Sequence, residues 1–83
     1  MSKILINLSI PAIADSCDIW IPDFLEVKAL IPMLANVVTE HSAGRYTSSG
    51  QEFLCYVEKN QVLEGSARIQ DCGIQNGDHL MLF

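Results

Sequence analysis

Residues 69–82, IQDCGIQNGDHLML, carry the densest set of structural signals in the chain. Asp71 can cap a single helical turn, and Gly73 can adopt the left-handed backbone conformation that ends such a turn. The Asn-Gly pair at 76–77 is a strong turn signal. Apolar and other residues then alternate over 79–83, which predicts a closing strand with one buried face.

The first quarter of the chain predicts a β-hairpin. Apolar residues alternate over 4–10 and again over 17–21, which is the period of strands with one buried face. Residues 11–16 contain Pro, Ala and Asp and predict the turn between the two strands. Pro22 is expected to end the second strand, because it cannot donate to a strand ladder.

An amphipathic helix is predicted after the hairpin. Asp23 and Glu26 have the spacing of a capping box at its start. Pro32 lies on the polar face, removes a helical hydrogen bond to the Lys28 carbonyl, and is expected to kink the helix or loosen its middle. Gly44 is a candidate C-terminal cap. The apolar positions recur at intervals of three and four: Phe24, Val27, Leu30, Ile31, Leu34, Val37 and Val38.

The segment between the helix and the closing strand predicts short β-structure. Residues 42–50 are polar and contain Gly, so we expect a loop. Residues 53–57 form an apolar run of strand length, 58–60 a turn, and 62–63 a short apolar pair. With the hairpin and the closing strand, this order predicts a mixed sheet covered on one face by the helix. The fold class is α+β, in one domain over residues 1–83.

Composition and charge exclude several classes of function. The 83 residues are 49% hydrophobic and 18% charged, which is ordinary for a small globular domain with one core. Five basic and ten acidic residues give a formal charge of -5, and basic residues do not cluster, which argues against binding nucleic acid or anionic lipid. No apolar run approaches the roughly 18 to 20 residues that span a bilayer, and the N-terminus lacks a signal-peptide pattern. We expect a cytoplasmic protein without direct membrane insertion.

Chemistry at the cysteines is not expected. Cys17, Cys55 and Cys72 are an odd number, widely separated and without a Cys-x-x-Cys pair, which favours small core or half-buried thiols over a disulfide framework or a zinc site. A nucleophilic Cys72 would need His41 or His79 beside it and an oxyanion site. The predicted turn around Cys72 explains it better, so no catalytic residue, no cofactor and no metal ligand is predicted.

The order and lengths of the segments resemble the ubiquitin-like β-grasp fold, a mixed four- to five-stranded sheet packed on one helix. The motif Asp71-Cys72-Gly73-Ile74-Gln75-Asn76-Gly77-Asp78 before the last strand, with Leu63-Glu64-Gly65 ahead of it, is similar to the YukD/EsaB family of bacterial type VII (WXG100, ESX) secretion systems. The resemblance implies a non-catalytic protein-protein interaction module, an accessory or regulatory component of the secretion apparatus. Its implied partners are membrane-associated secretion components, and a homodimer is left open.

A ubiquitin-like carrier or modifier, such as a sulfur carrier, is the alternative function. Such proteins activate a C-terminal glycine carboxylate on an extended arm. The sequence ends at Phe83 without a Gly-Gly tail, so we expect the carrier function to be absent.

The uncovered face of the sheet is the predicted binding surface. Side chains that alternate with the buried ones point away from the helix, and we expect them to form one contiguous apolar patch. Aromatic residues and Met are enriched at protein interfaces. The other interpretation is that some of these side chains fold over the sheet edge or lie under the loop at 42–50. The predicted surface residues are Leu5, Trp20, Val57, Met81 and Phe83, with Cys55 as a further candidate.

Overall fold

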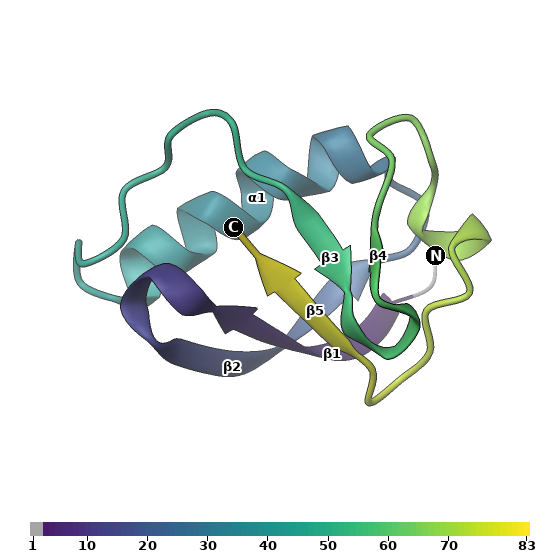
Figure 1. The fold of residues 1–83 in the computed structure, drawn as a ribbon, viewed down its shortest axis with the longest axis horizontal. Coiled ribbons are helices and arrows are strands. Elements are labelled where there is room, and N and C mark those ends of the chain that lie inside the picture. The colour runs from purple at the N-terminus through teal and green to yellow at the C-terminus, as the bar shows by residue number, and fades with distance from the viewer. Residues whose placement is uncertain (1–2) are drawn as a thin grey trace.

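One mixed sheet and one helix build the structure, a computed structural model that describes residues 3–83. The helix α1 (Val27–His41) crosses one side of the sheet (Figure 1). The strand order is β2-β1-β5-β3-β4, with β1 and β5 parallel and the other neighbours antiparallel. The α+β prediction is therefore confirmed. The strands are β1 (Lys3–Ile10), β2 (Asp15–Pro22), β3 (Leu54–Tyr56), β4 (Gln61–Val62) and β5 (His79–Leu82).

The core lies between the sheet and α1. Alternate residues of the central strands face the helix, and α1 presents one apolar face to them, so that the largest side chains leave water together. The strand residues that alternate with period two and the helix residues that recur with period 3.6 thus pack against each other in one core. The fully buried members are Ile6, Leu8, Ile10, Ile21, Val27, Leu30, Leu34, Val38, Leu54, Ile69, Leu80 and Leu82.

The start of α1 differs from the predicted capping box. The cap is Glu26, which makes no side-chain capping hydrogen bond, and Asp23 lies outside the helix. The first amides of α1 instead donate to a distant loop: Val27 N–H to the Ala67 carbonyl at 2.8 Å and Lys28 N–H to the Gly65 carbonyl at 2.9 Å. A tertiary contact supplies the acceptors that side chains supply in a capping box.

The remainder of α1 agrees in part with the sequence pattern. The helix is continuous across Pro32, which is exposed. Phe24 precedes the helix and Val37 is exposed, so the predicted apolar face is narrower than the pattern indicated. At the other end the cap is Ser42 instead of the predicted Gly44, and Ala43, with a φ of 55°, is the left-handed residue that ends the helix. Gly44 follows it and donates its N–H to the Thr39 carbonyl at 3.1 Å, which is the outer bond of a Schellman motif.

The motif before β5 closes the sheet instead of forming a capped helical turn. Asp71 is the last residue of the 3-10 turn Ile69–Asp71, and no side chain caps that turn, so the predicted capping role of Asp71 is wrong. Gly73 does adopt the left-handed conformation, with a φ of 79°. Leu5 N–H donates to Asn76 Oδ1 at 2.9 Å, and Gly77 N–H donates to the Leu5 carbonyl at 2.8 Å. The Asn76 side chain and the Gly77 backbone thus continue the hydrogen bonding between β1 and β5 beyond the start of β5.

Candidate interaction surface

An apolar patch lies at one end of the uncovered sheet face. Met81 and Cys55 are cross-strand neighbours in β5 and β3, and Cys55 pairs in turn with Val62 in β4. Phe53 and Phe83 exchange two backbone hydrogen bonds of 2.9 Å, and each stands two residues from Cys55 or Met81, so all five side chains share a face. We name these five residues the Phe53–Phe83 patch. Phe53 is 62% exposed, Val62 59% and Phe83 54%.

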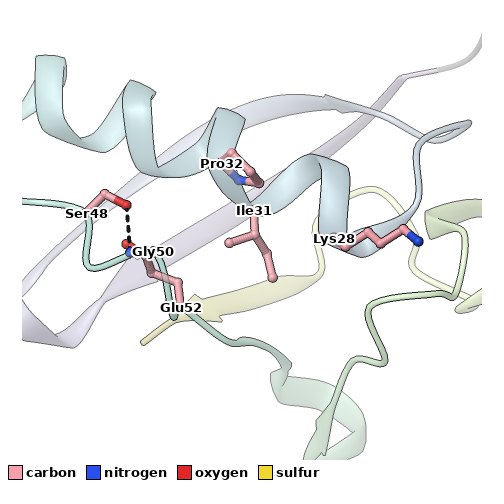
Figure 2. A pocket seen from close by; sticks show the side chains of 6 residues that line it. All are labelled: Lys28, Ile31, Pro32, Ser48, Gly50 and Glu52. Carbon is pink, nitrogen blue, oxygen red and sulfur yellow. Dashed lines mark hydrogen bonds between the residues drawn. The ribbon is translucent and has the colours of Figure 1, made fainter.

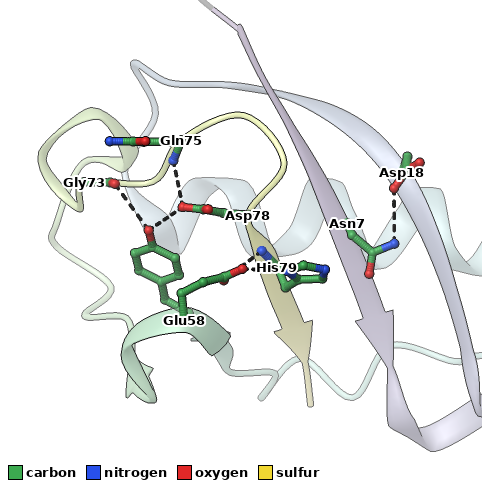
Figure 3. Close-up of polar contacts among 8 residues, drawn as sticks. Asn7, Asp18, Glu58, Gly73, Gln75, Asp78 and His79 are labelled. Carbon is green, nitrogen blue, oxygen red and sulfur yellow. Dashed lines mark hydrogen bonds and ion pairs between the residues drawn. The ribbon is translucent and has the colours of Figure 1, made fainter.

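A polar row crosses the same face and divides it. Asn7 pairs with Asp18 on one side and with His79 on the other, and Asn7 Nδ2 donates to Asp18 Oδ1 at 3.1 Å (Figure 3). The paired Leu5 and Trp20 lie beyond this row. The register therefore separates them from the Phe53–Phe83 patch, and the expected contiguous patch is two patches.

The predicted surface residues fall in three places. Met81 and Phe83 belong to the Phe53–Phe83 patch, with Met81 half-buried. Leu5 and Trp20 form the second group, in which Trp20 is exposed. Val57 is exposed but lies in the 3-10 turn Val57–Lys59 after β3, not in the strand that the sequence predicted.

Glu58 and His79 form a two-point contact beside the polar row. The Glu58 carboxylate accepts the His79 backbone N–H at 2.9 Å and faces the ring Nδ1 at 2.6 Å (Figure 3). The hydrogen bond with Glu58, and then its charge, raises the pKa of His79, while the bond with His79 lowers the pKa of Glu58. The pair therefore stabilises the fold most at pH values above 4.5, the ordinary pKa of Glu, and below 6.5, the ordinary pKa of His.

Glu58→Gln is expected to lower the pKa of His79 toward 6.5, its ordinary value, because the charged acceptor is lost. The stabilisation from a raised His pKa is complete below that ordinary value and is lost as the pH rises through the folded value. An NMR titration of the His79 ring, repeated at high salt, measures the change, since salt screens exposed pairs. Glu64→Gln, an exposed Glu outside the pair, is the control. An unchanged pKa of His79 in Glu58→Gln would show that Glu58 and His79 do not form this pair in solution.

Tyr56 and Asp78 join the end of β3 to the loop before β5. The Tyr56 hydroxyl donates to the Asp78 carboxylate. The carboxylate also accepts the Gln75 N–H at 2.9 Å (Figure 3). The bond to Asp78, followed by burial, raises the pKa of Tyr56 to about 12. The bond from Tyr56, followed by that from Gln75, lowers the pKa of Asp78. Asp78 therefore anchors a turn, which is a structural use of the carboxylate.

The surface hollows and thiols of the described residues do not converge into a reactive site. A hollow of about 260 Å³ between α1 and residues 48–52 is lined by Ile31 and Glu52 (Figure 2), below the usual range of about 300 to 1,000 Å³ for ligand pockets. The Glu52 carboxylate already accepts the Tyr46 hydroxyl at 2.7 Å. Cys72 lines a second hollow and donates to the Arg68 carbonyl at 3.2 Å.

The protonation of Cys72 argues against a nucleophilic thiol. Burial, and then the charge of Asp71, raises the pKa of Cys72, so less thiolate is present at neutral pH. The ring Nδ1 of His79 faces Glu58. All three cysteines are half-buried free thiols, as predicted.

Most of the chain matches the model of a known protein family. Residues 5–82 match the family model described as "WXG100 protein secretion system (Wss), protein YukD". The chain belongs to the YukD family. The match includes both patches of the open face except Phe83, and it contains the whole motif 71–78. A comparison with curated proteins found no match.

Solved structures share the fold of this YukD-family chain. The ubiquitin-like domain of EccD5 from Mycobacterium xenopi superposes with a TM-score of 0.81 at 13% identity, covering 100% of this chain and 94% of that one. The ubiquitin-like domain of the Mycobacterium tuberculosis type VII secretion protein ECCD1 gives 0.76 at 16% identity, covering 99% and 98%. Ubiquitin from Caldiarchaeum subterraneum gives 0.72 at 14%, covering 98% and 91%. The ubiquitin-like β-grasp fold is confirmed.

One further neighbour is larger than this YukD-family chain. A chain of the "MycP5-free ESX-5 inner membrane complex, State II" superposes with a TM-score of 0.84 at 13% identity, covering 100% of this chain but only 21% of that one. This chain therefore spans about a fifth of that neighbour. Within residues 3–83, no helix has both the length and the apolar character to cross a membrane.

Two residues of the Phe53–Phe83 patch were not predicted from sequence. Phe53 begins the apolar run 53–57, whose strand prediction does not give the face of Phe53, although its position two residues before Cys55 indicates the same face. Val62 joins the patch only through its pairing with Cys55. No local pattern in the sequence could have shown that pairing.

Proposed function

We propose that this protein is a non-catalytic accessory component of a type VII (WXG100) secretion system and that it works in the cytoplasm by protein-protein contact. The observation that carries the proposal is the family match over residues 5–82. The described residues offer an exposed apolar surface instead of a reactive site, which supports a docking role. The proposed partner is a membrane-embedded component of the same system, because ubiquitin-like domains of this fold occur in EccD proteins and in an inner membrane complex.

The Phe53–Phe83 patch is the proposed docking face. Two exposed Phe rings beside Met81 provide the aromatic and flexible apolar groups that dominate the energy of interface centres. The polar row at Asn7 and His79 borders the patch and would lie at the rim of such an interface. Trp20 and Leu5 beyond that row form a separate surface in this proposal.

The double variant Phe53→Asp with Phe83→Asp is expected to weaken binding to the purified membrane component by about tenfold or more, because it removes the central aromatic anchors and adds buried charge. Biolayer interferometry with the detergent-solubilised component measures the dissociation constant. Circular dichroism verifies that the variant folds. Phe24→Asp is the matched control, since Phe24 is an exposed Phe outside the sheet face.

Two results would count against the proposal in different ways. Equal binding by the double variant and the parent protein would show that the partner docks elsewhere. Failure of the parent protein to bind any membrane component of the secretion system would remove the proposed function itself.

A further inference from the structure

Among residues 3–83, no strand pairs with the outer edge of β2. It is the terminal strand of the order β2-β1-β5-β3-β4 and pairs with β1 along its eight residues. The opposite terminal strand, β4, has only two residues. A strand edge with free backbone groups is a template for another extended chain.

The hydrogen bonds of β1 identify which groups of β2 point outward. Asn7 N–H donates to the Asp78 carbonyl at 2.9 Å, and the Leu5 carbonyl accepts the Gly77 N–H at 2.8 Å, so both residues direct their backbone groups toward β5. Their partners on β2 are Asp18 and Trp20. These antiparallel pairs are therefore of the kind that exchanges no hydrogen bonds. The N–H and C=O groups of Asp18 and Trp20 must point away from β1.

Both ends of this free edge are closed. Ser16, the outward-pointing residue before Asp18, gives its N–H to the Asp15 carboxylate at 2.8 Å. Pro22, the outward-pointing residue after Trp20, has no N–H to give. The free backbone donors of the β2 edge are thus confined to Asp18 and Trp20. We name these two residues the window.

Partly exposed apolar side chains lie on the helix side of the sheet. Ile19 lies between the two window residues, faces the core and is only half-buried. On α1, Ile31 lines the hollow against residues 48–52, which precede β3 (Figure 2). Met33 is about 200° around the helix from Ile31, so it belongs to the opposite flank, the one toward β2. Met33 is 47% exposed and Val37, one turn further, is 40% exposed.

Charge selects the kind of strand that fits. Asp18 is exposed on the open face within the window, whereas the Asp15 carboxylate on the same strand already pairs with Arg45 at 3.3 Å. Two copies joined edge to edge would set a second chain of net charge -5 beside Asp18. A basic residue opposite Asp18 would instead make a favourable cross-strand pair.

We propose that the β2 edge takes up an extended, basic segment of a partner protein as a sixth strand. Lys or Arg of that segment lies opposite Asp18, and its alternate side chains are β-branched or apolar and cover Ile19, Met33 and Val37. Main-chain bonds to Asp18 and Trp20 supply affinity, and the alternation supplies specificity. This surface is separate from the Phe53–Phe83 patch, so the proposal does not depend on that patch.

The probe is the peptide acetyl-Lys-Val-Lys-Val-Lys-Val-amide, titrated into ¹⁵N-labelled full-length protein. At saturation we expect the exchange of the Asp18 and Trp20 amide protons with solvent to slow by about tenfold or more, because both become hydrogen-bonded. The Ile19 amide, already within the β1–β2 ladder, should change little. Asp18→Asn should weaken binding several-fold, whereas Asp71→Asn, which changes an exposed Asp of the 3-10 turn, should not.

N-methylated peptides separate strand addition from surface adsorption. One peptide carries N-methyl groups on all Lys residues, and the other carries them on all Val residues. An added strand directs only alternate N–H groups to β2, so one of the two peptides should lose binding: the Lys-methylated one if the strand is antiparallel, the Val-methylated one if it is parallel.

Four outcomes would overturn the proposal. The first is equal behaviour of the two methylated peptides, and the second is a set of shifts centred on Met81 and Phe83. The third is the absence of binding at millimolar peptide. The last is slowed exchange at Asp18 and Trp20 that depends on protein concentration without peptide, which would identify a second copy as the occupant.

Discussion

Leu80→Ala is expected to destabilise the protein by about 2–5 kcal/mol, the range for removing a large buried aliphatic side chain. Leu80 is fully buried at the centre of the sheet, where it pairs with Leu8 of β1 and Tyr56 of β3. Its loss opens a cavity among three strands and the helix. Small domains have about 5–15 kcal/mol of total stability, so this variant would lose a large share of it.

Urea unfolding followed by circular dichroism measures the effect, since a domain of this size usually unfolds in one step. Met81→Ala is the matched control, because Met81 follows on the same strand and faces the open side. We expect a loss of about 1 kcal/mol or less for the control. If both variants lost the same free energy, the assignment of β5 faces on which the docking patch rests would be wrong.

The sequence was sufficient to predict the parts of the fold that depend on local periodicity. The hairpin, the helix and the closing strand each follow from the spacing of apolar residues, and the family motif at 71–78 agrees with the family match. Burial then follows from alternation: Leu80 and Leu82 are buried, and Phe83 is exposed.

The features that the sequence could not supply depend on contacts between distant residues. The prediction of a capping box was wrong because the N–H groups of Val27 and Lys28 donate to the carbonyls of Ala67 and Gly65. The predicted contiguous patch failed because β1 and β5 pair in a register that sets Asn7 beside His79. No local period encodes the relative shift of two strands that lie far apart in the chain.

The same limit applies to the polar contacts. Asp78 reads as a turn residue in the sequence, and it is one, but its partner Tyr56 lies 22 positions earlier. The free window at Asp18 and Trp20 also needed a distant fact, the direction of the β1–β5 hydrogen bonds. Sequence therefore predicts which face a residue takes, whereas structure shows which neighbours it meets there.

Tyr56→Phe is expected to cost about 1.5–3 kcal/mol at neutral pH, the range for a hydrogen bond to a charged group. The substitution keeps the buried ring and removes only the hydroxyl that donates to Asp78. The Asp78 carboxylate would keep the Gln75 N–H and lose its strongest donor. Asn7 N–H donates to the Asp78 carbonyl, so the loss of the hydrogen bond between Tyr56 and Asp78 should loosen the end of the β1–β5 ladder.

The pH dependence of this loss distinguishes the bond to the charged Asp78 carboxylate from the other contact of the hydroxyl, with the uncharged Gly73 carbonyl at 3.3 Å. The lowered pKa of Asp78 stabilises the fold above its ordinary value of 3.8, and this contribution is lost as the pH falls through the folded value. The raised pKa of Tyr56 stabilises the fold below 10.0, and this contribution is lost as the pH rises toward about 12. The difference between the parent protein and Tyr56→Phe should therefore be constant between about 4 and 10 and shrink outside that range.

Urea unfolding of both proteins at pH 3 and pH 7 tests this expectation. Tyr46→Phe is the control, since it removes the same atom from a bond to Glu52 that closes only a short local loop, and we expect a smaller loss from it. A Tyr56→Phe variant as stable as the parent protein at pH 7 would show that the bond contributes nothing. A difference that persisted undiminished at pH 3 would assign the effect to the other contact of the hydroxyl, with the Gly73 carbonyl at 3.3 Å, because the charged acceptor would then be irrelevant to it.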